Sequence, residues 1–205
     1  MSLYSKYLLP RLIDLAMRNR DQVRMRREWI PQARGEVLEI GIGSGLNLPF
    51  YNSSVKRVRG VDPSRELGKM ASKRSAGVSF EIEFFLQSAE ANLPIEDRGI
   101  DTAVVTWTLC SMNNPLAALR EAKRVLKPDG RLIFVEHGRS CDAGVAAWQD
   151  RITPVWKHIA GGCMLNRQVD ELVTSAGFQI TELHTGYAVG PRPMTYMFQG
   201  IAQMA

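Results

Sequence analysis

The sequence predicts an α/β protein built on a doubly wound, mainly parallel sheet of seven strands. Two observations predict it: apolar segments of strand length alternate with amphipathic segments of helix length, and a glycine-rich turn follows the first apolar segment. Strands that alternate with helices form parallel sheets with both faces covered. We expect the last strand to run antiparallel. Residues 1–35 are expected to form a basic helical cap on a single domain that spans residues 36–205.

The predicted elements follow one another at short intervals. Strands are predicted near residues 36–41, 57–62, 79–85, 100–106, 130–136, 178–183 and 194–202, and helices near 45–50, 64–75, 115–127, 145–158 and 166–176. The string Pro128-Asp129-Gly130 predicts a turn before the fifth strand. Residues 186–193 are too many for a tight hairpin and predict a loop at the rim of the sheet.

The turn after the first strand has the spacing of a nucleotide-binding loop. Gly41, Gly43 and Gly45 follow Glu39, and glycines let the backbone turn tightly and approach a ligand closely. The dinucleotide fingerprint has its third glycine one residue later, where this chain has Leu46. The loop therefore favours S-adenosylmethionine over NAD in a Rossmann-like fold.

A carboxylate stands at the end of the second predicted strand. Asp62 follows Val61 and precedes Pro63 and Ser64. An acid at this place can accept hydrogen bonds from both hydroxyls of an adenosine ribose. The alternative is a turn former ahead of Pro63. Because the glycine loop precedes it, we favour the ribose role for Asp62.

These residues and three later segments resemble the class I S-adenosylmethionine-dependent methyltransferases. The later segments are residues 87–90 with 93–94, residues 101–105 and residues 126–132. The resemblance implies that Glu39 faces the methionine amino group of the cofactor and that Ala89 and Glu90 face its adenine. Ser88 stands where the family usually has Asp, so the contact to the adenine amino group is expected to be weaker there or to fall to Glu90. The implied cofactor-binding residues are Glu39, Gly41, Gly43, Gly45, Asn47, Asp62, Pro63, Ser88, Ala89, Glu90 and Thr106.

Composition and cysteine content indicate one soluble domain. A chain of 205 residues with 45% hydrophobic and 23% charged residues can bury one good core. No apolar run approaches the ~20 residues of a membrane-spanning helix, and the first residues lack the pattern of a signal peptide. Three cysteines without a C-x-x-C pair indicate a reducing compartment. We therefore expect a cytoplasmic location.

The net charge of +5 is concentrated in residues 1–35. Eight basic and three acidic side chains lie there (8 − 3 = +5), and the remainder balances at 18 of each sign. Pro10 suits a first helical turn. A stripe with nearly the helical period also predicts a helix, and it consists of Leu8, Leu12, Leu15, Asn19, Val23 and Ile30. One interpretation is a capping helix with a solvated basic face. The other is peripheral contact of residues 1–30 with an anionic membrane. Nucleic-acid binding is not expected, because no second basic patch appears.

The acceptor site is expected beyond the carboxyl ends of the fourth and fifth strands, where ligands bind in such sheets. Residues 106–112, Glu136-His137 and residues 148–167 fall there. A candidate apolar wall consists of Trp107, Leu109, Cys110, Trp148 and Trp156. The alternative for the tryptophans is core packing, and for Cys163 a small buried hydrophobe. The spacing of Cys110, His137, His158 and Cys163 suggests no metal site.

A narrower resemblance covers this region. Residues 156–159, 162–163, 165 and 167 are similar to a segment of the thiol S-methyltransferases, the methyltransferase-like seven group. Leu109-Cys110-Ser111 and Glu136-His137 also fall where that group has Leu-Cys-Ser and Glu-His. The resemblance implies a small hydrophobic thiol as the methyl acceptor. That group has an apolar N-terminal anchor, which this chain replaces with its basic helix.

Methyl transfer from a sulfonium is an in-line displacement, so the protein mainly orients the nucleophile and excludes water. A thiol attacks as thiolate, which requires a base or selection of the ionised form. His137 is the first candidate base and His158 the second, and a structural role is the alternative for each.

Two other functions stay open. One is methylation of a membrane lipid amine (on nitrogen) or of a quinol (on carbon or oxygen), and Glu136 is the carboxylate near that acceptor. The other is non-catalytic S-adenosylmethionine binding in a regulatory protein.

Overall fold

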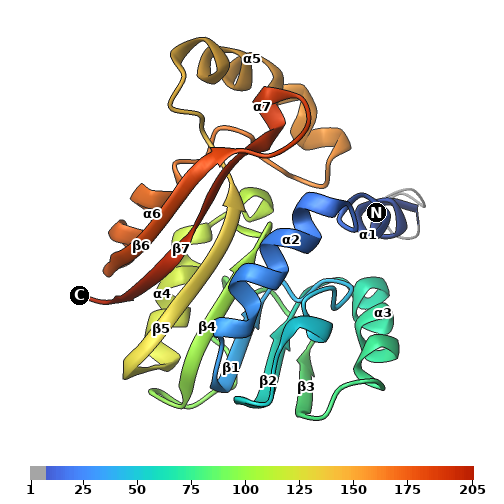
Figure 1. Cartoon of the computed structure of the whole chain (residues 1–205), viewed down its shortest axis with the longest axis vertical. Coiled ribbons are helices and arrows are strands. Elements are labelled where there is room, and N and C mark those ends of the chain that lie inside the picture. Colours follow the sequence, from blue (N-terminus) through green and yellow to red (C-terminus); the bar gives the residue numbers. More distant parts are fainter. Residues whose placement is uncertain (1–7) are drawn as a thin grey trace.

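The computed structural model describes residues 8–205 and contains the predicted sheet. Seven strands lie in the order β3-β2-β1-β4-β5-β7-β6, as Figure 1 shows. They are β1 (Gly35–Ile40), β2 (Val55–Val61), β3 (Glu81–Phe85), β4 (Ile100–Thr106), β5 (Leu126–His137), β6 (Phe178–Tyr187) and β7 (Tyr196–Met204). Strand β7 is antiparallel to both β5 and β6, whereas the other pairs are parallel. The predicted fold class, including the antiparallel last strand, is confirmed.

Helices cover both faces of the sheet and one end of it (Figure 1). They are α1 (Leu9–Ala16), α2 (Arg20–Trp29), α3 (Arg65–Ser75), α4 (Pro115–Val125), α5 (Ala143–Ile159), α6 (Val169–Ser175) and α7 (Arg192–Thr195), with short 3₁₀ turns η2 (Ile30–Gln32), η3 (Leu48–Phe50) and η4 (Leu109–Ser111). Asn19, Ser64 and Asn114 cap α2, α3 and α4 by accepting hydrogen bonds from backbone N–H groups, as N-cap side chains do. Within residues 8–205, no helix has the length and apolar character to cross a bilayer.

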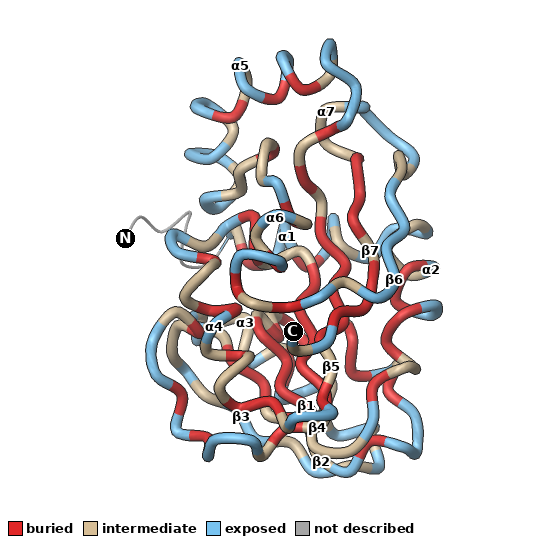
Figure 2. Tube along the Cα trace, turned by 90° about the vertical axis from the view of Figure 1, so that its left-hand side faces the viewer, coloured by how far each residue is buried: buried red, intermediate tan, exposed pale blue. Residues whose placement is uncertain are grey.

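Successive strand residues pack into two different cores, which explains the continuous apolar runs. Val37 belongs to the cluster formed with Met25 and Trp29 of α2, whereas Leu38 belongs to the cluster formed with Leu119 of α4. Side chains alternate between the faces of a strand, so both faces of the central strands are apolar. Figure 2 shows the buried central strands within a shell of more exposed helices and loops.

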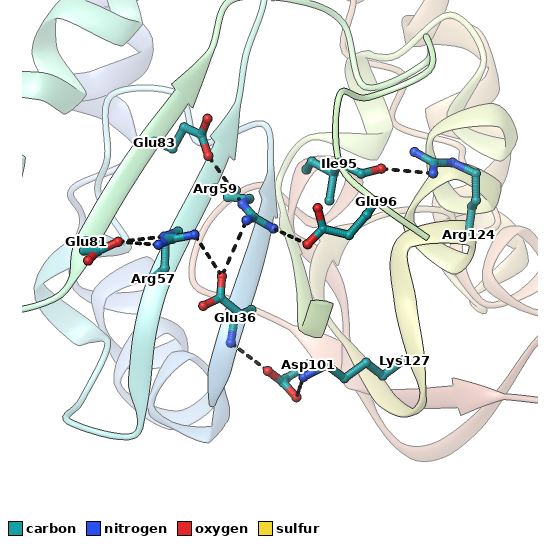
Figure 3. Close-up of polar contacts among 10 residues, drawn as sticks. All are labelled: Glu36, Arg57, Arg59, Glu81, Glu83, Ile95, Glu96, Asp101, Arg124 and Lys127. Atoms are coloured by element: carbon teal, nitrogen blue, oxygen red, sulfur yellow. Dashed lines mark hydrogen bonds and ion pairs between the residues drawn. The ribbon is translucent and has the colours of Figure 1, made fainter. Parts of the chain in front are cut away.

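Charged side chains pair near the amino ends of the parallel strands (Figure 3). Arg57 contacts Glu81 at 2.5 Å and Glu36 at 3.8 Å. Asp101 contacts Lys127 at 2.7 Å and accepts a hydrogen bond from the Glu36 backbone N–H at 2.8 Å. These charges pair with one another. A ligand site is expected at the opposite edge, beyond the carboxyl ends of the strands.

Three local predictions within the domain are wrong. Residues 45–50 form no α-helix, only the turn η3 after Asn47, because the loop residues bond to the strand and to Asp62 instead. Pro128-Asp129-Gly130 lies within β5, whose register with β4 shifts between Ile100 and Thr102. The shift accommodates the three extra residues in extended form. The predicted rim loop at 186–193 contains the end of β6 and the start of the short helix α7.

The N-terminal segment is two helices rather than one, and the predicted apolar stripe is not its buried face. Asn19 separates the two helices. Its side chain accepts hydrogen bonds from the Asp21 and Gln22 N–H groups and so caps the start of α2. Leu12 and Leu15 are 46% and 68% exposed. The buried side chains of α1 are instead Pro10 and Asp14, and those of α2 are Met25, Arg26 and Trp29.

Candidate active site

A cavity of about 480 Å³ opens at the carboxyl edge of the central strands. Its size is that of a small-molecule site. The glycine loop and the ends of β4 and β5 form its base, and α1 and the end of α5 form its walls. The lining residues are Leu12, Ile13, Asp14, Ala16, Met17, Arg26, Glu39, Gly41, Ile42, Gly43, Ser44, Leu46, Asn47, Asp62, Leu67, Thr106, Trp107, Thr108, Cys110, Ser111, His137, Trp156, Ala160, Gly161 and Cys163.

The glycine loop is held against the strands by backbone contacts that side chains would prevent. Gly41 has φ +71°, and a Cβ there would lie 2.1 Å from the Thr108 hydroxyl oxygen. The Gly43 N–H donates to Asp62 Oδ2 at 3.0 Å, and the Ser64 N–H donates to Asp62 Oδ1 at 2.7 Å. Burial raises the pKa of Asp62. Asp62 thus both shapes the loop and presents a carboxylate to the cavity.

A buried polar network surrounds Glu39 at the base of the cavity. Glu39 accepts hydrogen bonds from Asn47 Nδ2 at 2.9 Å and from the Tyr51 hydroxyl at 2.8 Å. Arg26 donates to Asn47 Oδ1 at 2.9 Å and lies over the Trp107 ring at 4.6 Å from its centroid. Burial raises the pKa of Glu39 to about 7, although hydrogen bonds from Tyr51 and Asn47 and the charge of Arg26 act to lower it. The network places the Arg26 guanidinium near the Glu39 carboxylate. A cation and an acid so close together suit the carboxylate and the ammonium of an amino acid moiety.

Helix α1 is tied to the glycine loop by a buried carboxylate. Ser44 Oγ donates to Asp14 Oδ1 at 2.5 Å, and Arg74 of α3 pairs with the same oxygen at 2.8 Å. Arg18 pairs with the other oxygen of Asp14. Burial acts to raise the pKa of Asp14, but the hydrogen bond from Ser44 and the charge of Arg74 lower it overall. The charge of this carboxylate therefore holds α1 over the cavity.

Two cysteines and a histidine converge at the far end of the cavity. Cys110 lies in η4, His137 ends β5, and Cys163 follows α5. His137 Nε2 lies 3.1 Å from Cys163 Sγ, and Trp156 Nε1–H donates to that sulfur at 3.3 Å. A hydrogen bond from Cys110, together with those from His137 and Trp156, holds the pKa of the Cys163 thiol well below its ordinary value. Burial acts to lower the pKa of His137, but its contact with Cys163 raises it overall.

The structure brings many of the predicted site residues together. Seven of them line the cavity next to the glycine loop and beyond β4: Glu39, Gly41, Gly43, Asn47, Asp62, Thr106 and Trp107. Cys110, His137 and Trp156 line its far end. Gly45, Pro63, Ser88, Ala89 and Glu90 are not among the lining residues, and Glu90 lies beside a second hollow next to α4. The predicted adenine contacts of residues 88–90 stay predictions.

Three of the predicted acceptor-site residues lie elsewhere. His158 is exposed on α5 and does not line the cavity, because residues two apart on a helix face different directions and Trp156 takes the inward one. Trp148 is 57% exposed and Leu109 is fully buried in the core. In this structure His158, Trp148 and Leu109 therefore lie outside the lining of the cavity.

Sequence reasoning missed several residues that the fold adds to the site. Asp14 and Arg26 come from the segment read as a solvated cap, and Cys163 was read alternatively as a small hydrophobe. No local signal marks them, because α1 and α2 reach the cavity only through tertiary packing. For Cys163 a signal existed: Cys110, His137 and Cys163 each lie in a segment similar to the thiol S-methyltransferases.

Comparison with known proteins shows the family of this chain. A profile described as a methyltransferase domain matches residues 38–134. The Homo sapiens thiol S-methyltransferase TMT1B is 32% identical over 187 residues, which cover 85% of this chain and 75% of the human protein. This chain belongs to the same family of S-adenosylmethionine-dependent methyltransferases. The family predicted from sequence, and the assignment as an enzyme, are confirmed.

Other relatives support the family and the fold. The Rattus norvegicus thiol S-methyltransferase TMT1B is 36% identical over 150 residues, which cover 72% of this chain and 61% of the rat protein. The chain thus spans about three fifths of that relative. A chain in the solved complex between the Haloferax volcanii Trm112 methyltransferase activator and a putative methyltransferase has a TM-score of 0.75 at 16% identity, covering 100% of this chain and 99% of that chain. That likeness shows the fold alone.

Proposed function

We propose that this methyltransferase transfers the methyl group of S-adenosylmethionine to the sulfur of a small hydrophobic thiol. The observation that carries the proposal is the composition of the cavity's far end. Cys110, His137, Trp156 and Cys163 line it, and no carboxylate of residues 8–205 does. The family members TMT1A and TMT1B carry thiol S-methyltransferase names, which supports the same acceptor class.

The residues at the base of the cavity fit the cofactor. Glu39 is positioned for the ammonium of the methionine moiety and Arg26 for its carboxylate, because both line the cavity and share Asn47. Asp62 suits the ribose hydroxyls, and the bare backbone at Gly41 and Gly43 allows close approach of the ligand. When bound, the cofactor supplies an activated methyl group on a sulfonium. The chain's own residues orient the acceptor and exclude water.

The alternative acceptor, an amine, is expected to need a carboxylate positioned beside it. Glu136 was the carboxylate that supported it, but Glu136 is fully buried and is not a lining residue. Its Oε1 accepts hydrogen bonds from the Thr108 N–H at 2.7 Å and the Leu109 N–H at 3.1 Å. Burial raises the pKa of Glu136 to about 7. Glu136 therefore supports the loop after β4 and does not reach an acceptor.

A panel of acceptors tests the proposal. Purified protein is incubated with S-adenosylmethionine and, separately, an alkyl thiol, a more acidic aromatic thiol, phosphatidylethanolamine vesicles and a reduced quinol. We expect demethylated cofactor and methyl thioether from the thiols only. Turnover of the lipid or the quinol, with none of any thiol, would overturn the acceptor assignment. The absence of turnover with every acceptor would favour the non-catalytic, cofactor-binding alternative.

Matched tryptophan variants locate the acceptor within the cavity. Trp156→Ala removes a lining ring and is expected to lower kcat/KM for apolar thiols about tenfold or more, the size of a lost hydrophobic contact. Trp148→Ala, on the same helix but outside the cavity, is the control and should behave like the wild type. Equal losses in the two variants would show that helix α5 acts only structurally.

A further inference from the structure

The far end of the cavity contains three metal-ligand side chains whose arrangement the thiol chemistry alone does not explain. The Sγ atoms of Cys110 and Cys163 and a ring nitrogen of His137 all lie within 4.8 Å of one another. The three residues come from three separate segments of the chain and all line the cavity. The spacing of these residues in the sequence suggests no metal site. Spacing cannot reveal this cluster, because the fold brings its members together from separate segments.

The loops that hold the two cysteines are fixed to each other. The Met164 N–H donates to the Cys110 carbonyl oxygen at 2.8 Å. Gly162 has φ +91°, and a Cβ there would lie 3.1 Å from the Ser111 carbonyl oxygen. Residues bound in this way keep the two sulfurs close before any ligand arrives. Preorganised first ligands are what a metal site requires.

The histidine presents its Nε2 atom to the cluster. That atom faces Cys163, whereas the Nδ1 atom is buried and has no hydrogen-bond partner among residues 8–205. Trp156 Nε1–H donates to the Cys163 sulfur, and hydrogen bonds of this kind stabilise and orient a ligand that carries negative charge. The groups around the cluster therefore favour an anionic sulfur and an imidazole that presents its Nε2 atom.

We propose that Cys110, His137 and Cys163 bind a Zn²⁺ ion whose fourth position opens into the cavity. Two sulfurs and one imidazole nitrogen are a donor set typical of zinc, and catalytic zinc sites have three protein ligands and one open position. Zinc bond lengths of about 2.3 Å to sulfur and about 2.0–2.1 Å to nitrogen place tetrahedral ligand atoms about 3.5–3.8 Å apart. The observed separations, from 3.1 Å up to 4.8 Å, bracket these values.

The ion explains how the acceptor becomes a nucleophile. This step rests on the proposed thiol acceptor. A Zn²⁺ ion held by Cys110, His137 and Cys163 would lower the pKa of an acceptor thiol at the open position, and the proton of that thiol would pass to solvent. The two cysteine thiolates would balance the charge of the dication. The acceptor sulfur then forms a bond to the donated methyl carbon while the carbon–sulfur bond of the sulfonium breaks, and that electron pair remains on the donor sulfur. The neutral thioether is a weaker ligand and leaves.

Metal content tests the site without reference to activity. Full-length protein purified under reducing conditions without chelator, after growth with added zinc, should contain about one zinc per chain. Cys110→Ser, Cys163→Ser and His137→Ala should lose it, whereas the exposed cysteine variant Cys141→Ser should keep it. Calorimetric binding of S-adenosylmethionine shows which variants are folded. His137→Cys should retain the metal, because it supplies a third thiolate.

Cobalt substitution reports on the ligands and the open position. The Co²⁺ protein should show sulfur-to-metal charge-transfer absorption that falls in each single cysteine variant, rises in His137→Cys and shifts when an alkyl thiol is added. Failure of the wild type to bind zinc or cobalt, or a Cys110–Cys163 disulfide that persists under reducing conditions, would overturn the site. Thiol methylation by metal-free protein would overturn the role of the ion in the reaction alone, whereas bound metal without thiol turnover would overturn the proposed acceptor alone.

Discussion

Glu39 combines full burial, two hydrogen bonds and a neighbouring arginine in a position that lines the cavity. An isolated carboxylate in such surroundings is expensive to ionise, and burial raises the pKa of Glu39 to about 7. The residue is therefore partly protonated near neutral pH when no ligand is bound. A ligand ammonium beside it favours the ionised form, which couples cofactor binding to pH.

The affinity for S-adenosylmethionine should therefore rise with pH through the titration of Glu39. The ionised fraction of a group with a pKa of about 7 grows roughly tenfold between about pH 6 and about pH 8, and only that form pairs with the ligand ammonium. Calorimetry should show weaker binding by Glu39→Gln and no such rise. Titration of the ligand affects both proteins equally, so the ratio of their affinities is the readout. A ratio independent of pH would contradict the role of Glu39.

At the scale of elements, α1 has two faces with different partners. Its inner face carries Asp14, which pairs with Ser44 and Arg74 and so covers the glycine loop. Its outer face exposes Leu8 and Leu15 at 51% and 68%. Basic residues Arg11, Arg18 and Arg20 are exposed in the same segment. Exposed apolar side chains of a helix next to exposed arginines are typical of contact with an anionic membrane surface.

We predict that the protein binds anionic vesicles through α1. Co-sedimentation should require phosphatidylserine and should fall as salt rises, because the charges are screened. Leu15→Asp should weaken binding severalfold by placing a charge at the lipid contact. The matched control is Leu86→Asp, at a site after β3 that is 54% exposed. If neither the vesicle charge nor Leu15→Asp changes sedimentation, α1 serves only to cover the cavity.

The elements that could be predicted from sequence are those whose cause is local. The glycine spacing from Gly41 to Gly45 indicates a ligand-binding turn directly, because such a turn needs a backbone without side chains. Asp62 is indicated by its place at the end of the next strand. The central strands follow from apolar runs that are buried on both faces. The helix predicted at 45–50 failed because Asn47 bonds to Glu39 and Thr106, contacts that the local sequence does not reveal.

For the molecule as a whole, the acceptor end of the cavity could not be predicted in the same way. Cys110, His137 and Cys163 meet only because β4, β5 and the segment after α5 end at one edge of the sheet. The same packing brings Arg26 under the cofactor site and turns His158 outward. The resemblance of these separate segments to thiol S-methyltransferases indicated the residues, but the sequence contained no sign that they touch.

The account's central claim is that the methyl group is transferred to sulfur. An apolar acceptor that carries one thiol and one primary amine tests it most directly, because the two nucleophiles share one molecule and enter the same cavity. Purified protein is given this aminothiol and methyl-labelled S-adenosylmethionine, and the product is located by fragmentation in a mass spectrometer. The account predicts label on sulfur, with the amine unmodified. Label on nitrogen, with the thiol free, would contradict it.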